Sequence, residues 1–132
     1  MPSSVARTFS DADDYAAAIP HSTAEVTVTG CGDFAATLTK IDLHRMWLQR
    51  FTENLPRVYH VDVWSSRAII TFRTQAGPSL LLDGRELQPS DIVRYSEGPS
   101  CYQRSSGSAC FASMSLPVAY MVSGGRRSQD AI

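Results

Sequence analysis

The residues of this chain best suited to metal chemistry are its three histidines, His21, His44 and His60. Residues two apart share one face of a β-strand, so Asp42 would lie beside His44, and Asp62 beside His60. A histidine and a carboxylate can bind a divalent metal, but a protein site usually needs further ligands. No two of the histidines are separated by a single residue. We therefore expect no metal site and interpret His44 and His60 as hydrogen-bonded strand residues.

The candidate nucleophiles are two of the three cysteines, Cys101 and Cys110. Neither has a sequence context that would activate a thiolate, and no base can be assigned to either. With Cys31 they make an odd number without a CxxC pair, which is typical of a reducing cytoplasm. We therefore expect no catalytic residue, no enzyme activity and a cytoplasmic location.

Arginine and aromatic side chains could instead bind a small anionic or aromatic ligand, by paired hydrogen bonds and stacking. Such side chains would have to occupy inward-facing strand positions. Neighbours such as Arg94 and Tyr95 point to opposite faces, so at most one of each adjacent pair can line an interior. The candidate ligand-binding residues are His44, Trp47, Arg94, Tyr102 and Arg104. The alternative is that the arginines are solvated and the tyrosines pack at the end of the strands.

Short β-strands are expected to position these residues. Apolar and polar residues alternate over residues 24–28 and 110–116, which is typical of half-buried strands. Asp83 and Gly84 tolerate positive φ and predict a type I′ hairpin turn. Further strands are predicted over residues 57–63, 67–73, 79–82 and 92–95. About seven or eight short strands with turns between them are typical of an antiparallel sandwich or barrel.

Two local patterns depart from simple alternation. A short helix is predicted after Ser10, which we expect to cap its free amides, and Pro20 should end it near Ile19. After the turn at residues 30–33, Phe34, Ala36 and Leu38 occupy even positions, but Ile41 and Leu43 occupy odd ones. This change of phase predicts a bulge or a strand buried on both faces.

The run Met46-Trp47-Leu48 is apolar at three successive positions. If it lies in a strand, at least one of these side chains faces outward. That side chain would be a dimer contact or a docking surface for another domain, or a helix or second sheet would cover it. The sequence leaves these alternatives open.

Length and charge exclude several classes of protein. The chain has 132 residues, which fits one domain. Its 12 basic and 13 acidic residues lack the positive surplus that nucleic-acid binding requires. No apolar run approaches the roughly 20 residues that span a bilayer, so we expect no membrane contact.

Several whole segments are similar to a known family. They are residues 9–19 (FSDADDYAAAI), 38–57 (LTKIDLHRMWLQRFTENLPR), 67–72 (RAIITF), 91–95 (DIVRY), 103–107 (QRSSG) and 114–117 (MSLP). Together, over residues 9–118, they resemble the N-terminal sensor domain of AraC-type bacterial transcriptional regulators. The resemblance implies a mainly β, cupin-like antiparallel barrel or sandwich over residues 21–118. An N-terminal segment with a short helix, residues 1–20, would precede it, and a polar tail or interdomain linker, residues 119–132, would follow.

The resemblance also implies a function. The domain would bind a small-molecule effector, mediate homodimerisation, or do both, without a cofactor. In this family a C-terminal pair of helix-turn-helix motifs contacts DNA, and no such pattern follows here, so we expect no direct DNA binding by this chain.

Two other functions stay open. One is a small cupin-type metal-dependent enzyme, although metal-binding cupins present a His-x-His pair, a following Glu and a later His, and this sequence lacks that set. The other is a stand-alone module that forms mixed dimers with a longer regulator.

Overall fold

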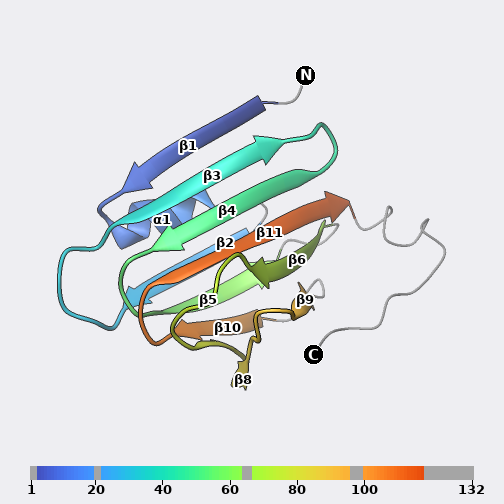
Figure 1. Cartoon of the computed structure of the whole chain (residues 1–132). Helices are drawn as coiled ribbons and strands as arrows, with labels where there is room; N and C mark the ends of the chain where they lie inside the picture. Colours follow the sequence, from blue (N-terminus) through green and yellow to red (C-terminus); the bar gives the residue numbers. More distant parts are fainter. Residues whose placement is uncertain (1–2, 20–21, 64–66, 96–99, 118–132) are drawn as a thin grey trace.

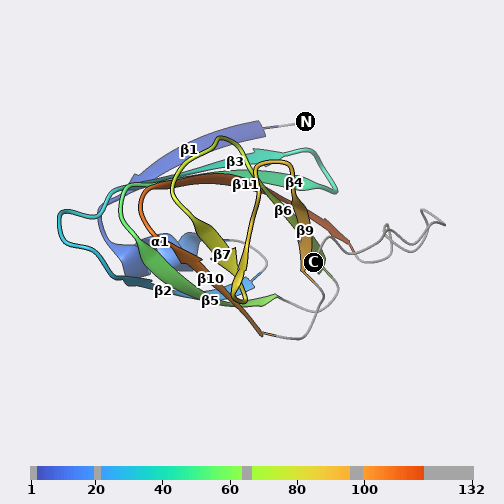
Figure 2. The ribbon, with the colours of Figure 1, turned by 60° about the horizontal axis from the view of Figure 1, so that its bottom comes forward.

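The chain folds into two antiparallel β-sheets that face each other, with one short helix at their side (Figures 1 and 2). The computed structural model describes residues 3–19, 22–63, 67–95 and 100–117, and every structural statement below refers to these ranges. The elements in chain order are β1 (Ser3–Phe9), α1 (Ala12–Ala18), β2 (Ser22–Val28), β3 (Ala36–Asp42), β4 (Trp47–Glu53), β5 (Arg57–Val63), β6 (Arg67–Arg73), β7 (Leu80–Leu82), β8 (Arg85–Glu86), β9 (Ile92–Tyr95), β10 (Ser100–Ser105) and β11 (Ala109–Pro117).

Strands of the two sheets are interspersed along the sequence. Sheet A has the order β1-β3-β4-β11-β6-β9, and sheet B has the order β2-β5-β10-β7-β8. Every hydrogen-bonded pair of neighbours is antiparallel. The described strands do not close into a barrel, because each sheet ends in strands that pair on one side only. The mainly β class and the antiparallel sandwich are thus confirmed. The described part of the chain contains no helix long and apolar enough to cross a membrane.

The core fills the space between the sheets and draws on both. In sheet A, Phe51 stacks on Phe111 with ring centroids 4.6 Å apart, and Tyr59 of sheet B meets Phe111 edge-on at 6.3 Å. Leu38 of sheet A and Leu82 of sheet B are also buried. These side chains alternate with outward ones along each strand, so burial of one face fixes the register.

Helix α1 closes one side of the sandwich, packed beside β2 (Figure 2). Its N-cap is Asp11, whose carboxylate accepts hydrogen bonds from the amides of Asp13 at 2.8 Å and Asp14 at 3.0 Å. The expectation that Ser10 caps the helix is therefore wrong by one residue. The chain bends at Ser10, directly after β1. The extended backbone of Asp11 then places its carboxylate over the free amides at the start of α1.

Most strand predictions are confirmed, and the hairpin at Asp83 and Gly84 is confirmed by positive φ angles of 50° and 84°. The expected bulge after residue 34 is wrong. All of β3 pairs without interruption with β1 on one side and β4 on the other. The change of phase arises because Ile41 lies half-buried on the outer face and Leu43 lies beyond the strand, in an exposed turn.

Strand β1 was not predicted from the sequence. Residues 3–8 of this strand are exposed on both faces, and only Phe9 is buried. A strand that buries one side chain has no alternating pattern for sequence analysis to detect.

Candidate functional site

A partly open cavity lies between the inner faces of the two sheets, and its lining combines apolar with polar side chains. The volume that the centres of water molecules can occupy in this cavity is about 40 Å³. Sheet A contributes Gln49, Thr71 and Ser113 to the lining, and sheet B contributes Gln103. Phe51, Tyr59, Phe111 and three aliphatic side chains supply the rest of the lining. At roughly 10–15 Å³ for each water, the cavity in this form has room for about three.

The polar lining of sheet A follows directly from strand register. Gln49 of β4 lies opposite Ser113 of β11, which lies opposite Thr71 of β6, so the three side chains form one row across the sheet. The Ser113 hydroxyl donates a 2.9 Å hydrogen bond to the Gln49 Oε1. All three residues are buried. Buried polar groups need hydrogen-bond partners, and Gln49 and Ser113 are partners of each other. The row therefore places hydrogen-bonding groups on the cavity wall, where a ligand could contact them.

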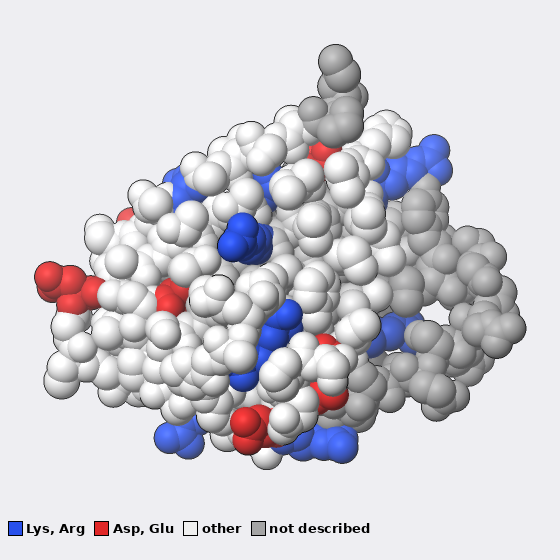
Figure 3. Space-filling view, viewed as in Figure 1, with Lys and Arg blue, Asp and Glu red and all other residues white. Residues whose placement is uncertain are grey.

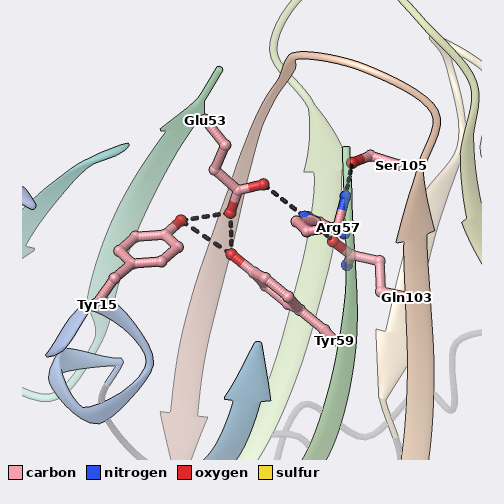
Figure 4. A network of polar contacts seen from close by, with 6 residues as sticks. All are labelled: Tyr15, Glu53, Arg57, Tyr59, Gln103 and Ser105. Atoms are coloured by element: carbon pink, nitrogen blue, oxygen red, sulfur yellow. Dashed lines mark hydrogen bonds and ion pairs between the residues drawn. The ribbon is translucent and has the colours of Figure 1, made fainter. Parts of the chain in front are cut away.

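A buried ion pair lies beside this cavity (Figure 4). Glu53 ends β4 and Arg57 begins β5, and both side chains are completely buried. The Arg57 Nε lies 2.6 Å from the Glu53 Oε1. The Arg57 Nη2 donates to the side-chain oxygen of Gln103, which itself lines the cavity. Gln103 therefore joins the ion pair to the cavity.

Two tyrosines complete the environment of Glu53 (Figure 4). The Tyr15 hydroxyl, carried by α1, donates a 2.5 Å hydrogen bond to the Glu53 Oε2. The Tyr59 hydroxyl is within hydrogen-bonding distance of the same oxygen and lies 2.9 Å from the Tyr15 hydroxyl. The guanidinium of Arg57 lies 3.8 Å above the Tyr59 ring. One carboxylate thus holds together the helix, sheet A and sheet B.

The electrostatics of the network follow from its burial. Burial raises the pKa of the Glu53 carboxyl above its usual value, and the charge of Arg57 opposes that shift. Burial also raises the pKa of the Tyr15 hydroxyl well above its usual value, and the negative charge of Glu53 adds to the effect. Tyr15 therefore stays a neutral hydrogen-bond donor.

Arg57 retains a capacity for further hydrogen bonding. Its Nη1 is buried and has no hydrogen-bond partner among the described residues. A guanidinium has five donor hydrogens, so a small acceptor group reaching this part of the interior would find an unused one. The arrangement can bind a small polar molecule, and it brings together no nucleophile with a base.

The structure does not bring the five predicted ligand-binding residues together. His44 lies in the exposed turn between β3 and β4, where its amide donates a 2.8 Å hydrogen bond to Asp42 and its φ is 83°. Trp47 is on the inner face of sheet A, half-buried at the start of β4, and does not line the cavity. Of the Met46-Trp47-Leu48 run, Leu48 therefore faces outward, opposite Met114.

The other three residues point away from the interior, contrary to our expectation. Tyr102 and Arg104 lie on the outer face of sheet B, because Cys101, Gln103 and Ser105 between and beside them are buried. Tyr102 is 56% exposed and stacks on His60 with ring centroids 4.7 Å apart. Arg94 lies on the outer face of sheet A, since its neighbour Val93 is the inward residue.

The histidines and carboxylates considered as metal ligands do not form one cluster among the described residues. Asp42 ends β3 and His44 lies in the following turn, so they do not share a strand face as expected. His60 and Asp62 do share the outer face of sheet B, where the His60 Nε2 lies 4.0 Å from an Asp62 oxygen and its Nδ1 lies 3.5 Å from Glu25. His21 is outside the described residues. Among the residues described, no group of three or more His, Cys, Asp or Glu is placed to bind a metal ion.

Sequence reasoning missed the polar residues that line the cavity, Gln49, Thr71, Gln103 and Ser113, and the buried pair of Glu53 and Arg57 beside it. A signal was present for part of the set: Gln49 and Glu53 are in phase with Phe51, on the inward positions of β4. Comparison with protein-family models, with curated proteins and with solved structures finds no match to this chain.

Proposed function

We propose that this chain is the regulatory domain of an AraC-type transcriptional regulator, and that it senses a small effector inside a cupin-like sandwich. The segment resemblance over residues 9–118 and the mainly β architecture support the proposal. Dimerisation is the second role that the proposal includes, and DNA contact belongs to a helix-turn-helix domain outside this chain.

The observation that carries the proposal is the polar cavity itself. A sandwich core stabilised only by packing usually has apolar side chains at its inward positions, because every polar group buried there must find a hydrogen-bond partner. Here Gln49, Thr71, Gln103 and Ser113 converge on one space between aromatic walls. An apolar pocket with a few convergent polar groups is the usual form of a small-molecule site.

The network supplies a route by which binding could be sensed. A ligand that hydrogen-bonds Gln103 competes with the Arg57 contact and so changes the interactions of Glu53. Glu53 in turn holds α1 through Tyr15. If the effector binds one arrangement of this network more tightly than another, it shifts the population of α1 positions.

Native mass spectrometry of gently purified protein tests the proposal, because it reports bound small molecules and metals together. We expect a metal-free protein carrying a small organic molecule. The variant Ser113→Leu fills the cavity from β11 and should lose that molecule, whereas Thr52→Leu on the outer face of β4 should retain it. A tightly bound metal would refute the proposal and support the alternative function, a small cupin-type metal-dependent enzyme. Equal retention of the molecule by both variants would place the ligand elsewhere.

A further inference from the structure

We propose that two copies of this chain associate through β1, which pairs antiparallel with β1 of the second copy and joins the two A sheets into one. The inference locates the dimerising role of the proposed function. It rests on the dimerising role in the proposed function and is independent of effector binding.

The first observation is a contrast among the four sheet edges. In sheet B, β2 is flanked by α1 and β8 has two residues. In sheet A, β9 has four residues, whereas β1 has seven and no described element pairs with its outer side. Figure 1 shows β1 alone along the upper border of the sheet. Long open edges invite pairing with another chain, and proteins usually shorten, cover or charge them.

The second observation is that β1 has few of the features that discourage such pairing. It contains no proline, glycine or lysine, and it pairs with β3 over all seven residues without a bulge. Its one charged residue, Arg7, lies with its guanidinium 4.8 Å from the Phe9 ring. The surface along this edge is largely uncharged in Figure 3.

The third observation is that β1 is poorly supported within one copy. Residues 3–8 are exposed, and Val5 is 52% exposed. Ordering a strand costs conformational entropy at every residue, and here only Phe9 is buried in return. A neighbouring strand would satisfy the free side of the backbone and cover Val5.

A second copy is the occupant that fits this edge. Two described seven-residue strands, β1 and β2, end a sheet, and β2 has α1 packed beside it, so β1 is the edge that fits a second β1. An antiparallel pair centred on Ala6 aligns all seven residues with their counterparts. Val5 then lies opposite the other copy's Arg7, Ser4 lies opposite Thr8, and no like charges meet. Such a two-fold contact is self-complementary, as closed dimers require.

A hollow beside β1 can accept the incoming side chains. It measures about 420 Å³ and lies between the end of β1 and α1, lined by Arg7, Phe9, Asp14, Ala17 and Ala18 among others. Odd-numbered residues of β1 share the face of Phe9, so Val5 of the second copy would enter on this side. A contact of one strand pair is small, so we expect a reversible dimer with a dissociation constant in the micromolar range.

Charge substitutions on the two-fold axis test the pairing. In the dimer the two Ala6 side chains lie directly opposite each other, about 5 Å apart at Cβ. Ala6→Lys should weaken dimerisation at least tenfold, measured by sedimentation velocity between about 1 and about 100 µM. Ala6→Glu should do the same, and an equimolar mixture of the two variants should restore the dimer. Thr52→Lys, exposed on the same face of sheet A but away from the edge, is the matched control and should dimerise like the original chain.

Three results would overturn the inference. They are a chain that stays monomeric over this range, an Ala6→Lys variant with an unchanged dissociation constant, and variants whose mixture fails to recover. The second and third results would leave dimerisation through another face, so the proposed function would stand. A monomeric chain would refute the dimerising role. Effector binding would be unaffected by that result, because native mass spectrometry tests it separately.

Discussion

Replacing Arg57 by methionine should destabilise the fold strongly, because it leaves the Glu53 carboxylate buried without its partner. Methionine keeps an unbranched apolar chain of similar reach, so the change removes mainly charge and hydrogen bonds. The lost contacts are the 2.6 Å pair with Glu53, the hydrogen bond to Gln103 and the position 3.8 Å above the Tyr59 ring. Breaking a buried pair from one side typically costs about 3–5 kcal/mol, and we expect a loss of unfolding free energy in that range.

Urea denaturation measures this loss as a lower midpoint at unchanged slope. The double variant Arg57→Met, Glu53→Gln removes both charges and should be more stable than Arg57→Met alone, because no uncompensated carboxylate stays buried.

Acidification gives an independent check. Without Arg57, burial raises the pKa of the Glu53 carboxyl further, although the hydrogen bond from Tyr15 still opposes the rise. A carboxyl whose pKa is raised in the folded state contributes stability below its unfolded pKa, and that contribution is lost as pH rises through the folded pKa. The difference in unfolding free energy between Arg57→Met and the original chain should therefore narrow as the pH falls from neutral toward the ordinary pKa of a glutamate, about 4.3. A loss below about 1 kcal/mol, or a difference that does not change with pH, would refute the reasoning about this network.

Three further predictions follow from single contacts. Above about pH 10 the original chain should lose stability, because the unfolded Tyr15 hydroxyl ionises while the raised pKa keeps it neutral in the fold, and Tyr15→Phe should lose less. Denaturation midpoints that fall equally with pH in the two chains would contradict this. Asp11→Ala should cost about 1 kcal/mol by removing the cap of α1, and thermal unfolding that matches the original chain would place the cap elsewhere. Phe111→Ala should cost about 3–5 kcal/mol by removing the ring stacked on Phe51, and a midpoint within error of the original would show that the core repacks.

The fold was predictable where burial imposes a local pattern. The strands β5 and β6 were predicted with their observed bounds, and the Asp83-Gly84 hairpin was predicted from its turn residues. The strand β1 was not predictable, because exposure of both faces removes alternation and its order depends on β3, about thirty residues away along the chain.

The candidate site was much harder to predict than the strands. Glu53 and Arg57 look like surface residues in sequence, and their partners Gln103 and Tyr15 lie far away along the chain. The expectation that arginines and tyrosines of β9 and β10 face inward depended on a register that sequence does not give. Tyr102 illustrates the difficulty: one position along, Gln103 is buried against Arg57 while Tyr102 is exposed.

The measurement that tests the central claim most directly is nuclear magnetic resonance of the side-chain amides of Gln49 and Gln103. The chain would be titrated with the molecule released in native mass spectrometry, or with a panel of the smallest polar organic molecules. If the cavity is the effector site, these two amide pairs shift together and saturably, and Ser113→Leu abolishes the shifts. Saturable shifts confined to the outer face of sheet B, around Tyr102 and His60, would contradict the account.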